Sequence, residues 1–428
     1  MTAQMPVRAS RRPGLLRSDR DFRWYWSGQT VSFVGSQVTA TALPLVAALT
    51  LKAGPGGVSV VATASFLPNL VLPLLAGHWL EGRGKRRVMV LADLVLADLV
   101  RAVVLLTVPV AFLTGTLSLE LLAGVAFVAG VANVFFDIGG FAYVPSLVPP
   151  ERLSEANRAM QGSSTLAQVG GPGLAGLLVQ ALGAPLALLV DAASYLTSVV
   201  GVSAARRPEP PVDERHTGGI RDGMRLILTH PYLRPLTAHA ALYNAAAQVF
   251  VVNLVIWVVR ENRVSPGLYG VALSAGGAGA FVGTMLALRL ADRLGYGRAF
   301  LASLSLSCGV PLLTAALPWT GGALGYGLAV LQVVAGAGLG SANVLSTTLR
   351  QTVIPRGQLA RANGAYRCLN FGTIPLGSAL AGVLGEAFGS RVGVALGTAG
   401  LALSALPMLA TGVRRLARLD DTAQPGPD

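Results

Sequence analysis

Long apolar stretches separated by short polar stretches dominate this chain. About twelve of them hold enough apolar residues to form a helix of roughly 20 residues, the length that crosses the ~30 Å hydrocarbon core of a bilayer. They are continuously apolar, whereas the strands of a membrane β-barrel alternate apolar and polar positions over ~10 residues. The pattern therefore predicts an all-α membrane protein with 12 transmembrane helices.

The predicted helices form two sets of six. The first set lies near residues 24–51, 58–80, 88–113, 117–143, 159–182 and 184–204, and the second near 235–259, 268–290, 299–318, 323–349, 362–384 and 392–412. This division predicts a tail (1–23), an N-terminal half (24–204), a polar linker (205–234), a C-terminal half (235–412) and a second tail (413–428). The first apolar run is too long for a signal peptide, so we expect residues 1–23 to be a retained tail.

Composition agrees with this class. Charged residues make up 12% of the chain, about half of the ~25% that is usual for soluble domains. Hydrophobic residues make up 53% and the mean hydropathy is +0.60, which excludes a disordered chain. The two cysteines, Cys308 and Cys368, both lie in apolar runs and are expected to be inert core residues.

Basic residues predict the orientation of the chain. With the N-terminus inside, 28 of the 33 Lys and Arg residues fall in the tails and in the loops on the cytoplasmic side. This asymmetry is the positive-inside rule, and it predicts a multi-pass protein of the cytoplasmic (inner) membrane with both termini cytoplasmic. It also accounts for the net charge of +13 without nucleic-acid binding, because the basic residues lie in short inter-helix loops.

The chain contains an internal repeat. Residues 147–183 match 353–389 at an offset of 206, and the Pro149 and Asn157 positions recur as Pro355 and Asn363. Two six-helix halves in the same orientation follow, related by an axis along the membrane normal. Such parallel repeats occur in secondary transporters, whose substrate site lies between the halves near the middle of the membrane.

Several segments resemble one family. They are residues 22–36 (FRWYWSGQTVSFVGS), 135–137 (FFD), 145–149 (PSLVP), 153–157 (LSEAN) and 230–234 (HPYLR). Over almost the whole chain they are similar to the major facilitator superfamily, and more narrowly to the branch that contains enterobactin exporters and macrolide efflux pumps. The resemblance implies two parallel six-helix halves that work by alternating access.

Two further motifs resemble signatures of this superfamily. Residues 77–86 (GHWLEGRGKR) and 292–295 (DRLG) resemble its loop signature, with Glu81 in place of the usual Asp and Gly82 in place of the usual Arg. The resemblance implies a cytoplasmic latch, for which the alternative is topogenic charge with a tight turn. The latch set is Gly77, Glu81, Arg83, Lys85, Arg86, Asp137, Asp292, Arg293 and Gly295.

Residues 171–176 (GPGLAG) resemble the antiporter signature, with Ala175 in place of a Gly. Its members here are Gly171, Pro172, Ala175 and Gly176. Gly and Pro together kink a helix and allow close packing. Ordinary helix packing is the alternative interpretation of this motif.

Ionisable residues inside the apolar runs are the sharpest candidates for chemistry. A charge at the centre of a membrane helix costs ~2.5–3.5 kcal/mol, so it needs a partner or a watery cavity. Asp98 and Arg101 are three residues apart and are predicted to pair, as a proton-coupling element or as a static structural pair. Asp191 is predicted to carry a proton or to be capped by its helix neighbours, and Asp93 is expected on another face of the third helix.

The resemblance implies that helices one, four, seven and ten line the substrate cavity. Polar and aromatic residues of these helices predict a mainly apolar lining that suits lipophilic molecules. The predicted lining residues are Gln29, Gln37, Asn133, Phe136, Tyr243, Asn244, Gln248, Asn253, Trp257, Gln332 and Asn343.

These features together predict a monomeric proton-coupled exporter of small lipophilic compounds such as antibiotics or secondary metabolites. Its partners would be a small-molecule substrate, protons and the lipid bilayer. The alternatives are a siderophore exporter and a facilitator without proton coupling; a membrane-embedded enzyme or a receptor is disfavoured. No catalytic constellation, cofactor motif or metal-ligand spacing is present in the sequence.

Overall fold

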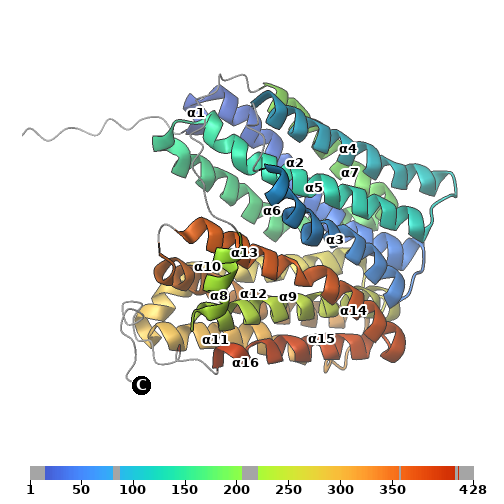
Figure 1. Cartoon of the computed structure of the whole chain (residues 1–428). Helices are drawn as coiled ribbons and strands as arrows, with labels where there is room; N and C mark the ends of the chain where they lie inside the picture. Colours follow the sequence, from blue (N-terminus) through green and yellow to red (C-terminus); the bar gives the residue numbers. More distant parts are fainter. Residues whose placement is uncertain (1–14, 81–86, 205–219, 356–357, 410–412, 414–428) are drawn as a thin grey trace, which may run out of the picture.

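The computed structural model describes residues 15–80, 87–204, 220–355, 358–409 and 413. Within these ranges the regular structure is helical, without strands. The helices lie side by side in two bundles that follow the two halves of the sequence (Figure 1).

The N-terminal bundle holds the helices before the linker. They are α1 (Leu15–Ser18), α2 (Arg20–Leu45) continued by the π-helical η1 (Val46–Thr50), α3 (Pro55–Leu80), α4 (Arg87–Leu113), α5 (Leu119–Leu147), the 3₁₀ turn η2 (Pro150–Arg152), α6 (Leu153–Leu182) and α7 (Ala184–Ala204).

The C-terminal bundle follows the linker, which itself contains α8 (Ile220–Thr229). Its helices are α9 (Leu233–Val255) with the π-helical η3 (Ile256–Glu261), α10 (Pro266–Leu294), α11 (Tyr296–Gly309) with the 3₁₀ segment η4 (Val310–Leu313), α12 (Gly321–Val353), α13 (Leu359–Phe371), α14 (Thr373–Phe388), α15 (Ser390–Ser404) and α16 (Leu406–Leu409).

Short polar residues begin several of these helices. The Asp19 carboxylate accepts a hydrogen bond from the Phe22 N–H at 3.0 Å, and Ser118 accepts one from the Leu121 N–H at 3.2 Å. Each of these caps satisfies a backbone donor that the first turn of a helix leaves free. The polar residues between the apolar runs therefore fix where α2 and α5 start.

The predicted helix plan is confirmed, with local differences. Ten helical segments in the described part are long and apolar enough to cross a membrane, and α3 and α11 with η4 occupy the two remaining predicted positions. The ninth predicted helix changes to 3₁₀ geometry at Val310, and the eleventh is interrupted at Gly372. Pro311 and Pro375 explain these breaks, because proline lacks the N–H that continues the helical ladder.

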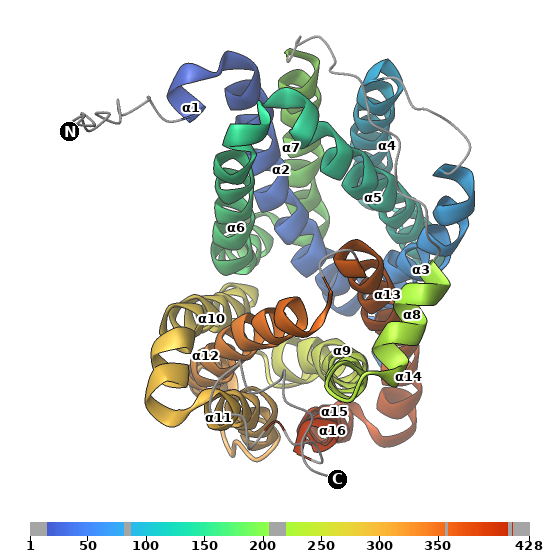
Figure 2. The same ribbon diagram turned by 60° about the vertical axis from the view of Figure 1, so that its left-hand side comes forward.

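The two halves touch mainly through two helix pairs. α6 packs against α10, and α3 packs against α14 (Figures 1 and 2). The ribbons meet at the end of the bundle that holds the connection between η1 and α3, and they diverge toward the end that holds α1 and α8 (Figure 1).

The internal repeat is visible in the backbone. α6 and α14 are followed directly by Gly183 and Gly389, whose φ angles are 86° and 84° and whose sequence offset is 206. The segments after η1 and η3 repeat too, because Lys52 and Arg263 are the two non-glycine residues of the described part with positive φ, at 52° and 54°. The halves therefore share the same local geometry at the end where they meet.

Candidate functional site

A cluster of buried polar side chains lies inside the N-terminal half, between α2, α4, α5 and α7. The predicted pair forms on α4, where the Arg101 Nη1 lies 3.2 Å from the Asp98 Oδ1. Asp98 has no exposed surface and Arg101 is 3% exposed. A helix of 3.6 residues per turn places positions three apart on one face, so the sequence spacing fixes this pair.

Arg101 extends from α4 to its neighbours. Its Nη2 donates a hydrogen bond to the Oδ1 of Asn133 on α5. Its guanidinium carbon lies 4.9 Å from the ring centre of Phe136 on α5 and 4.6 Å from that of Tyr195 on α7. Aromatic faces attract a cation, so the two rings and the Asp98 carboxylate together stabilise the buried guanidinium.

Asp191 is the second buried acid of this cluster. One oxygen of its carboxylate accepts a hydrogen bond from Thr39 on α2, and the other accepts one from Ser194 at 2.8 Å. The sequence predicted capping by helix neighbours as one role for Asp191, with Ser194 and Tyr195 as the neighbours concerned. The Tyr195 hydroxyl forms a 3.2 Å hydrogen bond with the Ser36 hydroxyl on α2. Asp191 therefore joins α7 to α2 instead of being satisfied by its own helix alone.

Ser198 connects Asp98 to α2. Its hydroxyl accepts a hydrogen bond from the Gln29 side-chain amide at 2.8 Å and also contacts Asp98. Asp191, Ser194 and Ser198 thus form a polar stripe on α7 with the three- and four-residue spacing of one helix face. The stripe faces α2, where glycine lets the helices approach, since a Cβ added to Gly35 would lie 2.4 Å from Asp191.

The predicted cavity residues fall into two groups. Gln29, Phe136, Asn253 and Trp257 are buried, and Asn253 donates to the carbonyls of Val249 and Ala381. The others are partly or fully exposed: Gln37, Asn133, Tyr243, Asn244, Gln248, Gln332 and Asn343.

Among the partly exposed group, three amides contact neighbouring helices. Asn133 accepts from Arg101, Asn244 donates to the Asn370 carbonyl at 3.3 Å, and Gln248 accepts from Ser378 at 3.3 Å. Their role in substrate binding stays a prediction.

The GPGLAG segment lies in a zone of close helix contact. A Cβ added to Gly171 would lie 2.3 Å from the Cβ of Gln37 on α2. A Cβ added to Gly176 would lie 2.3 Å from the Pro266 carbonyl oxygen of α10, in the other half. Ala175 is fully buried. The small residues of this motif therefore allow α6 to approach α2 and the C-terminal half at once.

The latch set is only partly covered by the structure. Glu81, Arg83, Lys85 and Arg86 lie outside the described residues. The burial of Gly77 and the side chains of Asp137 and the third-helix acid Asp93 are not described either. Asp292 and Arg293 are exposed at the end of α10, and Gly295 joins α10 to α11 with a φ of 82°. The latch stays a prediction.

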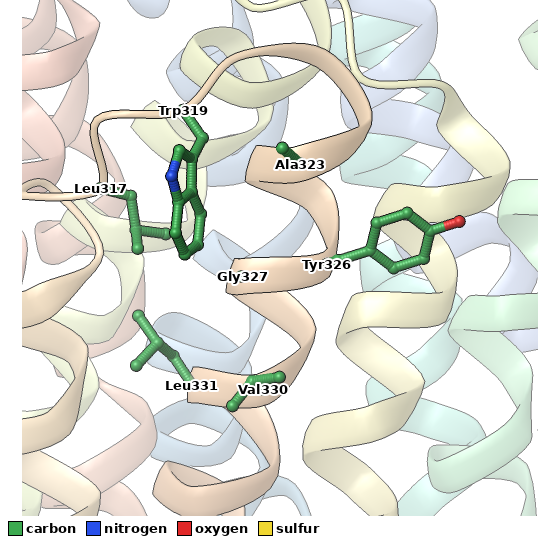
Figure 3. A pocket seen from close by; sticks show the side chains of 7 residues that line it. All are labelled: Leu317, Trp319, Ala323, Tyr326, Gly327, Val330 and Leu331. Carbon is green, nitrogen blue, oxygen red and sulfur yellow. The ribbon is translucent and has the colours of Figure 1, made fainter.

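An apolar pocket lies on the other half, at the start of α12 (Figure 3). Its volume is about 460 Å³. The Trp319 indole lies over Gly327, since a Cβ added there would be 2.6 Å from the ring. None of the predicted site residues lines this pocket, whose lining is Leu317, Trp319, Ala323, Tyr326, Gly327, Val330 and Leu331.

Sequence reasoning did not assign several members of the cluster. Thr39 and Ser198 hydrogen-bond to the buried network, although each is an ordinary hydroxyl in an apolar run. The polar stripe of α7 is the signal that points to Ser198. In the described residues, no group of three or more His, Cys, Asp or Glu side chains is placed to hold a metal ion.

Two parallel six-helix bundles with a buried charge cluster in one half define a secondary transporter of the major facilitator superfamily. The chain belongs to the family described as "Transmembrane secretion effector" (MFS_3), whose model matches residues 16–425. It therefore lies in the efflux branch of the superfamily and is a transporter rather than an enzyme.

Relatives and solved structures agree with this placement. The multidrug efflux pump Tap of Mycolicibacterium fortuitum is 29% identical over 86% of this chain and 89% of its own length. Macrolide efflux protein A of Streptococcus pyogenes is 24% identical over 52% of this chain and 55% of its own. A bacterial homologue of the iron transporter ferroportin, crystallised in an inward-facing state, has a TM-score of 0.72 at 18% identity and covers 93% of this chain and 99% of its own. The last likeness shows the fold alone.

Proposed function

We propose that this protein is a proton-coupled exporter that expels small lipophilic compounds from the cytoplasm. It lies in the cytoplasmic membrane with both termini inside, as the basic loops predict. The relatives named for multidrug and macrolide efflux support lipophilic drugs, including macrolides, as the substrate class. The proposed cycle opens a central site between the halves to one side of the membrane at a time.

The observation that carries the coupling is the hydrogen bond between Arg101 and Asn133. Arg101 belongs to the buried charge cluster, and Asn133 is a half-buried residue on α5, one of the helices expected to line the cavity. Thr39 makes a similar link from Asp191 to the partly exposed face of α2. A substrate that moves either side chain therefore changes the hydrogen bonding of a buried charge.

Rigid rocking of one half against the other does not separate Asp98 from Arg101, because both lie on α4. The coupling therefore works through the links to α2 and α5. When Asp191 takes up a proton, its carboxyl group no longer accepts two hydrogen bonds as an anion, and its attachment to Thr39 weakens. In the proposed exchange, substrate on α2 and α5 and a proton on the buried acids favour opposite access states.

Transport by the purified protein in liposomes tests this function. A macrolide and ethidium, a chemically unrelated lipophilic cation, serve as the two probes. Substrate accumulation should follow an imposed pH gradient and collapse when a protonophore is added. Accumulation that is unaffected by the protonophore would falsify proton coupling, and transport of neither probe argues against the substrate class.

Variants separate the acids from the rest of the chain. Asp98→Asn and Asp191→Asn should each remove the dependence on the pH gradient. Glu120→Gln is the matched control, because Glu120 is an exposed acid in the first turn of α5 in the same half. Gradient-driven transport that survives in both Asn variants, with the protein folded, contradicts the assignment.

A further inference from the structure

Two contacts between the halves repeat each other across the pseudo-twofold axis. On one side, the Gly267 N–H in the first turn of α10 donates to the Gln180 Oε1 of α6 at 3.1 Å. On the other side, the Gly56 N–H in the first turn of α3 donates to the Glu386 Oε1 of α14 at 2.9 Å. In both cases a side-chain oxygen near the C-terminal end of one helix caps the N-terminal end of a helix in the other half.

The repeat relates the members of these contacts. Gln180 and Glu386 differ by 206 positions, and Gly56 and Gly267 differ by 211. The first offset is that of residues 147–183 and 353–389, and the second is that of the positive-φ residues Lys52 and Arg263. The pair of contacts is therefore a symmetric element of the fold, which argues against a chance surface contact.

The helices around these contacts are held close by small residues. A Cβ added to Gly382 on α14 would lie 2.1 Å from the Ser59 hydroxyl of α3, and one added to Gly176 on α6 would lie 3.0 Å from the Gly270 Cα of α10. A further bond joins the halves at this end, since Arg260 donates to the Ala53 carbonyl at 2.7 Å.

Hydrogen bonds between the halves concentrate at this end. Among the described residues there are four, and three of them involve the first turn of α3 or α10 or the loop before α3. The fourth, from the Gly173 N–H to the Ser274 hydroxyl at 2.8 Å, lies further along α6 and α10. The end near α1 and α8 is where the halves diverge (Figure 1).

We propose that Gln180 and Glu386 are gate residues. Each holds the two halves closed at the end of the bundle away from α1 and α8, and their release sets how readily this end opens. The inference rests on the alternating access of the proposed function. It concerns the balance between closed and open states at this end in the absence of substrate and of an imposed pH gradient.

The two gate residues differ in charge, and this difference predicts the direction in which each substitution shifts the balance between closed and open states. Glu386 offers a carboxylate to a helix N-terminus, where the helix dipole favours negative charge, and its hydrogen bond is charge-assisted. Gln180 offers a neutral amide oxygen at the equivalent place. Glu386→Gln should therefore loosen the closed end, whereas Gln180→Glu should tighten it.

Pulsed electron–electron spin resonance measures this balance directly. Spin labels at Thr116 and Thr320, which are exposed in the loops α4–α5 and η4–α12, report the separation of the halves at this end. The labels are introduced in a Cys368→Ser background, since Cys308 is buried. The full chain in lipid nanodiscs, without added substrate, is the sample.

The expected shifts follow from the strengths of the two bonds. Gln180→Ala should raise the open-to-closed ratio by roughly 2–10-fold and Glu386→Ala by roughly tenfold or more. The double variant should exceed either. Glu386→Gln should raise the ratio, Gln180→Glu should lower it, and Glu120→Gln should leave it unchanged.

The gate is overturned if the distance distribution of the double alanine variant matches that of the parent protein. It is also overturned if Glu386→Gln and Gln180→Glu shift the ratio in the same direction. Because these two substitutions exchange one exposed polar group for another of the same size, they preserve the fold, which elution as a single species checks. The two hypotheses can fail separately. If the distances shift as expected but a protonophore does not affect transport, the gate is supported and the proton coupling is rejected.

Discussion

The two halves share one helix plan but bury different chemistry. The N-terminal half encloses two acids and an arginine, Asp98, Asp191 and Arg101, each at most 3% exposed. The buried polar side chains in the described part of the C-terminal half are hydroxyls, amides and one histidine: Thr237, His239, Asn253, Ser303, Ser307, Thr314, Ser341, Asn370, Ser378, Ser390, Thr398 and Ser404. Symmetry of the fold therefore does not extend to the charges.

Glycine contacts bring helix backbones together in both halves, and the closest of them lie in the C-terminal half. α10 and α12 meet at glycines, and a Cβ added to Gly283 would lie 1.9 Å from the Ala337 carbonyl oxygen. Such contacts come from small residues spaced four apart, which let membrane helices approach closely. Their positions are Gly279, Gly283, Gly336 and Gly340.

This difference indicates that the two halves have different roles in transport. A charge network needs polar partners that exchange hydrogen bonds, whereas glycine-mediated contact leaves little room for rearrangement. The proposed proton coupling therefore belongs to the N-terminal half, and we expect the α10–α12 pair to be the more rigid part of the protein. Four matched pairs of substitutions probe this comparison, from the largest expected effect to the smallest.

Replacing the buried arginine should lower the free energy of unfolding more than any of the other substitutions. Arg101→Met leaves the fully buried Asp98 without its cationic partner, and breaking a buried pair in this way costs about 3–5 kcal/mol. The free energy of unfolding in lipid–detergent micelles measures the loss. The same change at the exposed Arg367 of the C-terminal half, which lies 5.6 Å from the Phe371 ring centre, should cost about 1 kcal/mol or less. Equal losses would remove the contrast between the halves.

A methyl group added at the glycine contact between α10 and α12 should destabilise the protein less than the loss of the arginine. Gly283→Ala pushes a Cβ into the α12 backbone and should destabilise the protein by about 1–3 kcal/mol. In the N-terminal half, Gly124 on α5 has no atom within 4 Å of an added Cβ. Gly124→Ala should therefore be neutral or stabilising by up to about 1 kcal/mol. Thermal unfolding of both variants decides this point, and a stabilising Gly283→Ala would contradict the close contact.

One threonine in each half allows the strength of the buried hydrogen bonds to be compared. Thr39→Val removes a donor to the Asp191 carboxylate and should cost about 1.5–3 kcal/mol at most, because that hydrogen bond has a charged acceptor. Thr398→Val removes only a bond to the Ala395 carbonyl of its own helix and should cost under about 1 kcal/mol. If both variants unfold at the same temperature, the charge of Asp191 adds nothing to the bond.

The smallest effect should be equal in the two halves. Lys52 and Arg263 have left-handed backbone conformations that glycine adopts without steric cost. Glycine at either position should stabilise the protein by roughly 0.5 kcal/mol, after the entropy that glycine loses on folding. A stabilisation in one half only, measured by thermal unfolding, would show that the two connections are not equivalent.

Sequence patterns predicted the helices well because their causes are local. A run of apolar residues determines a membrane helix by itself, and the three-residue spacing of Asp98 and Arg101 determines their pair. The apolar pattern predicted the ninth and eleventh helices as continuous. Prolines within them mark where these helices change geometry.

The partners across helices could not be predicted in this way. Nothing in the local pattern indicates that Asn133 accepts from Arg101, that Thr39 caps Asp191, or that Gln29 is buried rather than exposed. Each depends on the rotation and depth of two helices relative to one another. The same is true of Gln180 and Glu386, which lie far in the sequence from the N–H groups that they accept.

The sequence by itself determined the class of protein, the two parallel halves and the presence of charges within the membrane, since composition, periodicity and repeats act within single helices. The tertiary structure decided which of these charges meet, in which half, and which residues join the halves at one end. The physical reason is that a charge or a polar group in lipid must find its partner on another helix, and only the packing of the bundle sets that distance.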